Sequence, residues 1–166
     1  METSGINDRN FNPPELCEYS GGDWDIYQEI LYGIFSQTLL SDDLFFQGLP
    51  VRIKRVPEYK NKHFAFWHLI SEGEKEEERT PDFRRCERIA WVRWTIENAE
   101  NHPKISLWNN KRGTNVHVVI WFEIENYAVI LAKRNGYFLL KTAYLLEKGR
   151  SATFAEERER FYKKKH

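Results

Sequence analysis

The most constraining feature of the chain is a run of alternating apolar residues, interrupted by short polar turns, that begins near residue 116. One face of the stretch 116–125 carries Val118, Ile120, Phe122 and Ile124, and the other carries His117, Trp121 and Glu123. The stretches 127–133 and 137–146 follow, separated by the turn 134–136, whose Asn-Gly pair tolerates positive φ. Period-2 alternation with such turns predicts an antiparallel β-meander.

Three further segments complete the predicted architecture. Apolar residues recur every three to four positions over 24–40, which predicts an amphipathic helix with Asp23 or Asp25 near its start. Thr80 as N-cap and Pro81 at the first helical position predict a second helix to about residue 98. The stretches 51–55 and 63–71 look extended and are predicted to pair as a hairpin.

These elements predict an α+β fold, in which two main helices pack on a four- to five-stranded antiparallel sheet. The charged tail predicts a short C-terminal helix. Residues 1–20 are rich in Asn, Ser, Gly and Pro and predict a flexible lead-in, and residues 21–166 predict a single domain.

Charge divides the chain into two unequal parts. Residues 1–50 contain nine acids and one base, whereas residues 51–166 contain 24 bases and 16 acids, so the net charges are −8 and +8. A basic region of this kind suits a polyanion such as RNA. An ordinary mixed surface explains the same numbers, because linear blocks need not form separate patches once the chain is folded.

Other class-defining signals point to a reduced compartment. The two cysteines, Cys17 and Cys86, lack CxxC spacing, which disfavours a disulfide scaffold. No apolar stretch approaches the roughly 18 residues of a membrane span, and the polar N-terminus does not resemble a signal peptide. The expectation is a soluble cytoplasmic protein without membrane contact.

Two histidines, His63 and His68, stand five residues apart among aromatics. An odd offset sends them to opposite faces of a strand, and on a helix it separates them by about 140°. No metal site is therefore predicted. On a strand His68 would share a face with Phe64 and Phe66, where its pKa could be tuned for proton transfer; a buried histidine bonded to backbone is the competing interpretation.

The second predicted helix opens with a basic stretch. Arg84 and Arg88 lie four residues apart and project from one face, with Trp91 one turn further and Arg85 beside them. Guanidinium groups can grip phosphate oxygens and an indole can stack on a base. A solvated stripe paired with nearby acids is the alternative.

The last predicted hairpin carries a further polar set. Lys133 and Arg134 lie at its turn, and Lys141, Thr142 and Tyr144 lie on its final strand. Thr142 and Tyr144 share a face with Phe138 and Leu140 and could point into a cleft at the edge of the sheet, although both residues also favour strands for packing reasons. A weaker acid–base possibility is formed by His117 and Glu123.

Taken together, FWHLISEG, RTPDFRRCERI and GYFLLKTAY resemble segments of small bacterial and phage-associated proteins related to the barnase–EndoU–colicin E5/D–RelE superfamily of metal-independent ribonucleases. The resemblance covers roughly residues 45–146, and its motifs are short and degenerate. The acidic N-terminal helix and the acidic loop after residue 72 have no counterpart in it.

The resemblance implies an endoribonuclease, toxin-like, that needs no cofactor: the RNA 2′-hydroxyl attacks the adjacent phosphate. The implied roles are acid or base for His68, phosphate clamps for Arg85 and Arg88, a hydrogen-bond donor for Thr142, and a stacking group or proton donor for Tyr144. RNA contacts are expected from Arg84, Trp91, Lys133, Arg134 and Lys141. The alternatives are a non-catalytic RNA- or protein-binding module of the same fold, or a protein whose acidic helix or basic tail docks a protein inhibitor or antitoxin.

Overall fold

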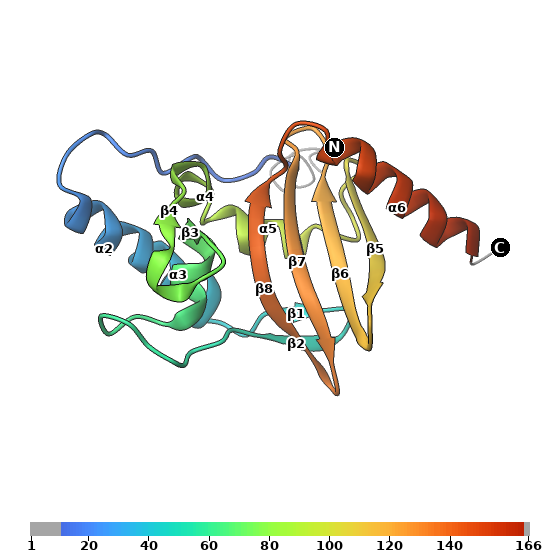
Figure 1. The fold of residues 1–166 in the computed structure, drawn as a ribbon, viewed down its shortest axis with the longest axis horizontal. Coiled ribbons are helices and arrows are strands. Elements are labelled where there is room, and N and C mark those ends of the chain that lie inside the picture. Colours follow the sequence, from blue (N-terminus) through green and yellow to red (C-terminus); the bar gives the residue numbers. More distant parts are fainter. Residues whose placement is uncertain (1–10, 165–166) are drawn as a thin grey trace, which may run out of the picture.

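A curled six-stranded sheet forms the centre of the structure, a computed structural model that describes residues 11–164 (Figure 1). The strand order is β1-β2-β8-β7-β6-β5. All neighbouring pairs are antiparallel except β2 and β8, which run parallel through Val51 opposite Phe138 and Arg52 opposite Leu139. The six strands are β1 (Phe45–Phe46), β2 (Leu49–Arg52), β5 (Ile105–Arg112), β6 (Asn115–Phe122), β7 (Tyr127–Arg134) and β8 (Tyr137–Leu145).

The predicted meander is confirmed in β6, β7 and β8. Gly136 has φ of 86°, as expected of the glycine in the tight turn between β7 and β8. A bulge interrupts this hairpin: Leu131 lies opposite Leu140, but Ile130 lies opposite Thr142, so Lys141 is an additional residue on β8.

Both faces of the meander are covered. Val118, Ile120 and Phe122 are buried in the main core, as predicted. On the other face Trp121 is also buried, because it packs with Trp108 and Phe154 under the C-terminal helix α6 (Arg150–Lys164). The second cluster explains why the part of that face under α6 is apolar, since a covered sheet face needs little polar alternation.

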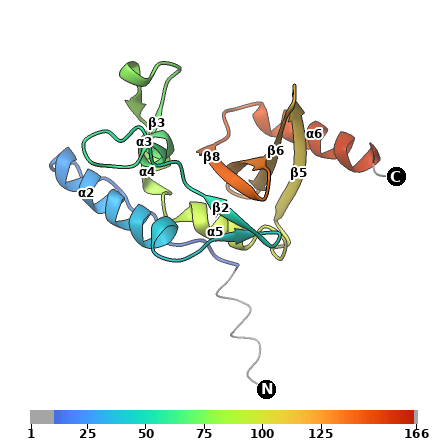
Figure 2. The ribbon, with the colours of Figure 1, turned by 90° about the horizontal axis from the view of Figure 1, so that it is seen from below.

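Helices stand on either side of the sheet (Figures 1 and 2). Helix α2 (Trp24–Phe35) begins at Asp23, whose carboxylate accepts from the Asp25 N–H at 2.8 Å, and it continues as a π-helical turn over Ser36–Leu40. This confirms the helix expected over 24–40. Helices α3 (Phe64–Ile70) and α4 (Phe83–Glu87) flank β8, and α5 (Trp91–Glu97) packs against the main core.

The predicted strand over 63–71 is wrong, and so is its hairpin with 51–55. Residues 64–70 form helix α3, which buries Ala65, Phe66, Leu69 and Ile70. Those positions follow a helical period, but a short run with one polar residue, His68, does not distinguish helix from strand until packing decides. Ser71–Glu72 is instead the short strand β3, which pairs with β4 (Thr80–Pro81) in a separate two-stranded sheet; a 3₁₀ turn over Glu76–Glu78 lies between them.

The single helix predicted over 80–98 is also wrong, because the chain leaves helical geometry at Arg88 and splits into α4 and α5. Thr80 lies in β4, so Asp82 is the N-cap: its carboxylate accepts from the N–H groups of Arg84 (3.0 Å) and Arg85 (3.3 Å).

We expect Asp82→Ala to lower the free energy of unfolding by about 1–2 kcal/mol, because two helical N–H groups lose their acceptor. Thr80→Ala, the matched control, should change it by less than about 0.5 kcal/mol. Urea denaturation of the two variants measures both values, and equal losses would contradict the assignment of Asp82 as the cap.

The predicted fold class therefore needs correction. Five α-helices within residues 11–164, a curled mixed sheet of six strands and a small second sheet replace two helices on an antiparallel sheet. The parallel contact of β2 with β8 was missed because two short segments far apart in the sequence make it. The expected C-terminal helix is present, with 15 residues.

The predicted lead-in, residues 1–20, is described from Phe11 onward. Its described part contacts the body of the protein: the Trp91 indole donates to the Pro14 carbonyl at 2.7 Å, and the Cys17 N–H donates to the Glu87 carbonyl at 2.9 Å. Residues 1–10 lie outside the described residues. Across residues 11–164, no helix is both long and apolar enough to cross a membrane.

Candidate functional site

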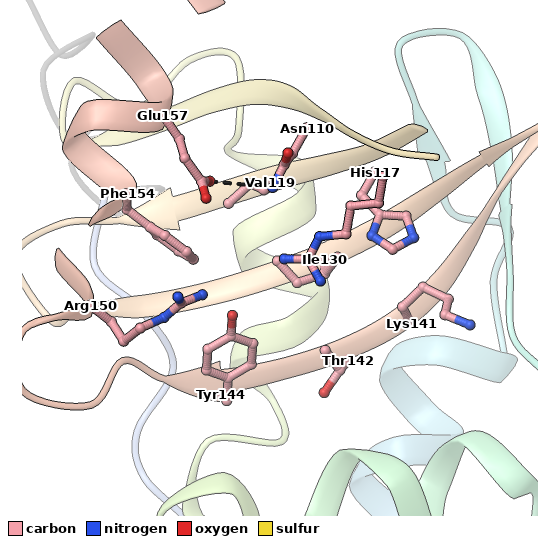
Figure 3. A pocket seen from close by; sticks show the side chains of 11 residues that line it. Asn110, His117, Val119, Ile130, Lys141, Thr142, Tyr144, Arg150, Phe154 and Glu157 are labelled. Carbon is pink, nitrogen blue, oxygen red and sulfur yellow. Dashed lines mark hydrogen bonds between the residues drawn. The ribbon is translucent and has the colours of Figure 1, made fainter. Parts of the chain in front are cut away.

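A pocket of about 340 Å³ lies between the second face of the sheet and the start of α6 (Figure 3). Strands β5, β6, β7 and β8 form its floor and α6 forms one wall. We call it the sheet pocket. Its lining residues are Asn110, Arg112, His117, Val119, Ile130, Lys141, Thr142, Tyr144, Arg150, Phe154 and Glu157.

Positive charge dominates the sheet pocket. Arg112, Lys141 and Arg150 line it, against one carboxylate, Glu157. That carboxylate accepts from the Asn110 amide and from the indole N–H of Trp108, each at 3.4 Å. Three cations around one cavity favour an anionic ligand, and guanidinium groups match the oxygens of a phosphate.

His117 supplies the imidazole of the sheet pocket. It lies on β6, opposite Asn110 on β5 and Ala132 on β7. Partial burial lowers its pKa from the usual 6.5, and the positive charges of Arg112 and Lys141 lower it further, with Arg134 adding to them. The lowered pKa favours the neutral form of the ring at pH 7, which can accept a proton.

We expect the His117 imidazole to titrate below 6.5 in the folded protein, and Arg112→Gln to raise its midpoint by removing one of the charges that oppose protonation. NMR of the ring protons measures both midpoints. Between the lowered pKa and 6.5 the unfolded chain binds more protons, so this group makes stability rise with pH in that window. A midpoint above 6.5, or no response to Arg112→Gln, would contradict this account.

Two of the predicted catalytic residues line the sheet pocket, Thr142 and Tyr144. The Tyr144 ring and the Arg150 side chain both point into it, from β8 and from the start of α6 (Figure 3). The predicted RNA-contacting Lys141 joins them because the bulge turns it to the same side as Thr142. The three polar residues that the sequence places on the final strand, Lys141, Thr142 and Tyr144, thus all line the sheet pocket.

Arg85 on α4 does not line the sheet pocket but lies near one of its lining residues, Tyr144. The carbon of its guanidinium group lies 5.8 Å from the centroid of the Tyr144 ring. The same group donates to the carbonyls of Ser71 (2.8 Å) and His68 (3.3 Å), and its Nε lies 3.5 Å from the Asp82 carboxylate. Arg85 therefore fixes the end of α3 against the edge of β8.

The His68 side chain is placed differently from the expected strand position. Its imidazole stacks on Phe64 one helical turn earlier, with centroids 4.1 Å apart and planes 28° apart. His68 is not among the residues that line the sheet pocket. Its backbone carbonyl accepts from Arg85, which lies near Tyr144 of the pocket.

The other predicted residues lie around α4, α5 and the β7–β8 turn. Trp91 is 4% exposed and packs against Phe122 and Tyr127 in the core, so its ring does not face solvent as base stacking requires. The Arg88 guanidinium lies 5.1 Å from the centroid of the Trp91 ring and donates to the carbonyl of Arg84. Arg84 itself is exposed.

The two basic residues at the hairpin turn end strand β7. Lys133 is exposed, and Arg134 donates to its carbonyl at 3.3 Å. Their charge reaches the sheet pocket only at a distance, since Arg134 contributes to the lowered pKa of His117 but does not line the cavity.

Sequence reasoning missed four polar residues of the sheet pocket, Asn110, Arg112, Arg150 and Glu157. Period-2 spacing places Asn110 and Arg112 on one face of β5, which could have drawn attention to them. On α6 the spacing 150, 154, 157 places Arg150 and Glu157 on the face of the buried Phe154. The contact between that face and the sheet was not evident from the chain.

Among the residues that the structure describes, no group of three His, Cys, Asp or Glu side chains is arranged to hold a metal ion. Comparison with family models, curated proteins and solved structures finds no match to this chain.

Proposed function

We propose that the protein is an endoribonuclease that cleaves RNA by attack of the 2′-hydroxyl on the adjacent phosphate, and that the sheet pocket is its active site. The observation that carries the proposal is the gathering of one imidazole, one phenol and three cations around a single cavity. RNA supplies its own nucleophile, so the protein must move two protons and stabilise charge on the phosphate. The lining residues match those tasks.

The cations hold the phosphate in this proposal. Arg112, Lys141 and Arg150 neutralise its oxygens, and the Thr142 hydroxyl donates a hydrogen bond to one of them. These interactions strengthen as charge develops on the phosphorane, which is what accelerates the reaction.

His117 and Tyr144 handle the protons. Neutral His117 takes the proton of the 2′-hydroxyl as the 2′-oxygen bonds to phosphorus, and the Tyr144 phenol donates a proton to the leaving 5′-oxygen as its bond to phosphorus breaks. The products are a 2′,3′-cyclic phosphate and a free 5′-hydroxyl. Imidazolium and phenolate then exchange a proton, directly or through water, which restores the starting state.

One observation favours the alternative of an RNA-binding module without catalytic activity. Arg85 and Arg88, the predicted phosphate clamps, already donate to backbone carbonyls, and this suits a structural role beside an RNA-binding surface. In that alternative the three cations of the sheet pocket bind RNA without cleaving it.

Incubating the purified chain with total RNA in the presence of EDTA distinguishes cleavage of RNA from binding without cleavage. The proposal expects fragments that end in 2′,3′-cyclic phosphate, and the alternative expects intact RNA that is bound and is released by salt. Material of Lys141→Ala, purified in the same way, controls for contaminating nuclease. Intact, unbound RNA would contradict both.

A further inference from the structure

A second and larger pocket is not used by the proposed reaction. It has a volume of about 630 Å³, within the usual range of ligand sites, and lies between α2, the segment 57–60 and α3. Four aromatic side chains line it, Trp24, Tyr59, Phe64 and Trp67, so we call it the aromatic pocket.

The charges of the aromatic pocket balance, unlike those of the sheet pocket. Lys60 and Arg79 line it together with Glu58 and Glu77. A cavity with aromatic walls and no net charge suits a flat, uncharged ring with a polar edge, to which these side chains can donate and accept hydrogen bonds. A nucleobase has that chemistry, and stacking on aromatic side chains accepts every base.

The outer wall of the aromatic pocket is both exposed and rigid. Tyr59 is 59% exposed, and its backbone exchanges two hydrogen bonds with Lys62, of 3.1 and 3.0 Å, across a tight turn. The Trp67 indole donates to the Tyr59 carbonyl at 2.9 Å, and the two rings lie 5.3 Å apart. A stacking surface fixed before the ligand arrives loses little conformational entropy on binding.

A short series of contacts connects the two pockets. Arg79, which lines the aromatic pocket, donates to the Ser71 carbonyl at 2.5 Å, and Arg85 donates to the same oxygen at 2.8 Å. Arg85 in turn lies against Tyr144 of the sheet pocket. Two arginines that share one carbonyl thus lie between residues of the two cavities.

We propose that the aromatic pocket holds an unpaired base of the same RNA strand whose phosphate occupies the sheet pocket. This inference rests on the proposed function and deepens it: the substrate is a single-stranded segment several nucleotides long, since a base in a duplex cannot leave its stack to enter a second pocket without cost.

Tyr59→Leu tests the inference because the side chain is exposed and its loss leaves the fold intact. The rate constant kcat/KM for a single-stranded octanucleotide should fall about tenfold, the loss expected from one stacked base, while that for a dinucleotide stays unchanged. Phe45→Leu, at another exposed aromatic (56% exposed) on β1, is the matched control and should alter neither value.

The outcomes separate this inference from the proposed function. Equal losses for both substrates, or no loss for either, would overturn the inference while cleavage itself upholds the function. If no RNA is cleaved, binding of a labelled octanucleotide decides: about tenfold weaker binding by Tyr59→Leu supports the inference, and equal or absent binding overturns it. Binding of a proline-rich peptide that Tyr59→Leu abolishes, with RNA cleavage unchanged, would assign the pocket to a protein partner and overturn it too.

Discussion

Replacing His117 by Gln should lower the rate of RNA cleavage about 100-fold or more. The amide keeps hydrogen-bonding groups near the same place but cannot take a proton from the 2′-hydroxyl, and proton transfer by a positioned side chain contributes about 10²- to 10⁴-fold. Single-turnover cleavage of a labelled oligonucleotide measures the loss. RNA affinity should change little, because the cations that hold the phosphate remain.

His68→Gln is the matched variant, since it makes the same chemical change at the other histidine that the sequence singles out. We expect cleavage within about threefold of the wild-type rate, because the imidazole stacks on Phe64 outside the sheet pocket and it is the backbone carbonyl that accepts from Arg85. The reverse pattern, with His68→Gln inactive and His117→Gln active, would move the reacting centre from the sheet pocket to α3.

The largest expected effect on stability is at Phe154. Its side chain is 2% exposed and anchors α6 to the sheet between Trp108 and Trp121, with ring centroids 5.4 and 5.8 Å away. Phe154→Ala should reduce the free energy of unfolding by about 3–5 kcal/mol, because it leaves a cavity in the second core cluster. Thermal and urea denaturation measure the loss.

Tyr162→Ala provides the comparison on the same helix. Tyr162 is 43% exposed and contributes one hydrogen bond, from its hydroxyl to the Leu107 carbonyl at 2.7 Å, so we expect a loss of about 1 kcal/mol. Similar losses at the two positions would show that α6 is not held by its buried face.

Phe154→Ala should also reduce RNA cleavage at temperatures where the protein is folded, since the residue lines the sheet pocket.

The parts of the fold that follow from local pattern could be predicted. Strands β6, β7 and β8 alternate with period 2 around an Asn-Gly turn, and α2 repeats its apolar residues every three to four positions, so each pattern admits one reading. The segment 64–70 contains a single polar residue, His68, which is too few to show the period of the segment in the sequence. It became a helix because Phe66 and Leu69 pack into the main core.

The break between α4 and α5 depends on tertiary contacts. Residues 83–97 contain no proline or glycine, so nothing local predicts an interruption at Arg88. Buried residues on both sides, Cys86 before the break and Trp91 after it, pack in the same core. The position of the break is set by how that core is filled.

The candidate site was predictable only along single strands. Strand spacing correctly pairs Thr142 and Tyr144 on one face, but the predicted company of Phe138 and Leu140 is wrong: the bulge at Lys141 turns Thr142 and Tyr144 to the face opposite the main core. Arg150 and Glu157 could not be assigned to the same cavity, because that requires knowing which side of the sheet α6 covers. The sequence makes His117 only a weaker candidate. The structure places it where burial and the charges of Arg112 and Lys141 lower the pKa of its imidazole.

The bulge on β8 separates the chemistry of the site from the stability of the fold. Since Leu140 and Ala143 face the main core on either side of it, Lys141 is an additional residue that neither core uses. Its side chain is exposed at the rim of the sheet pocket, so exchange for another residue alters the charge offered to a ligand without opening a cavity. A substitution at position 141 therefore changes the charge around the sheet pocket while both core clusters stay intact.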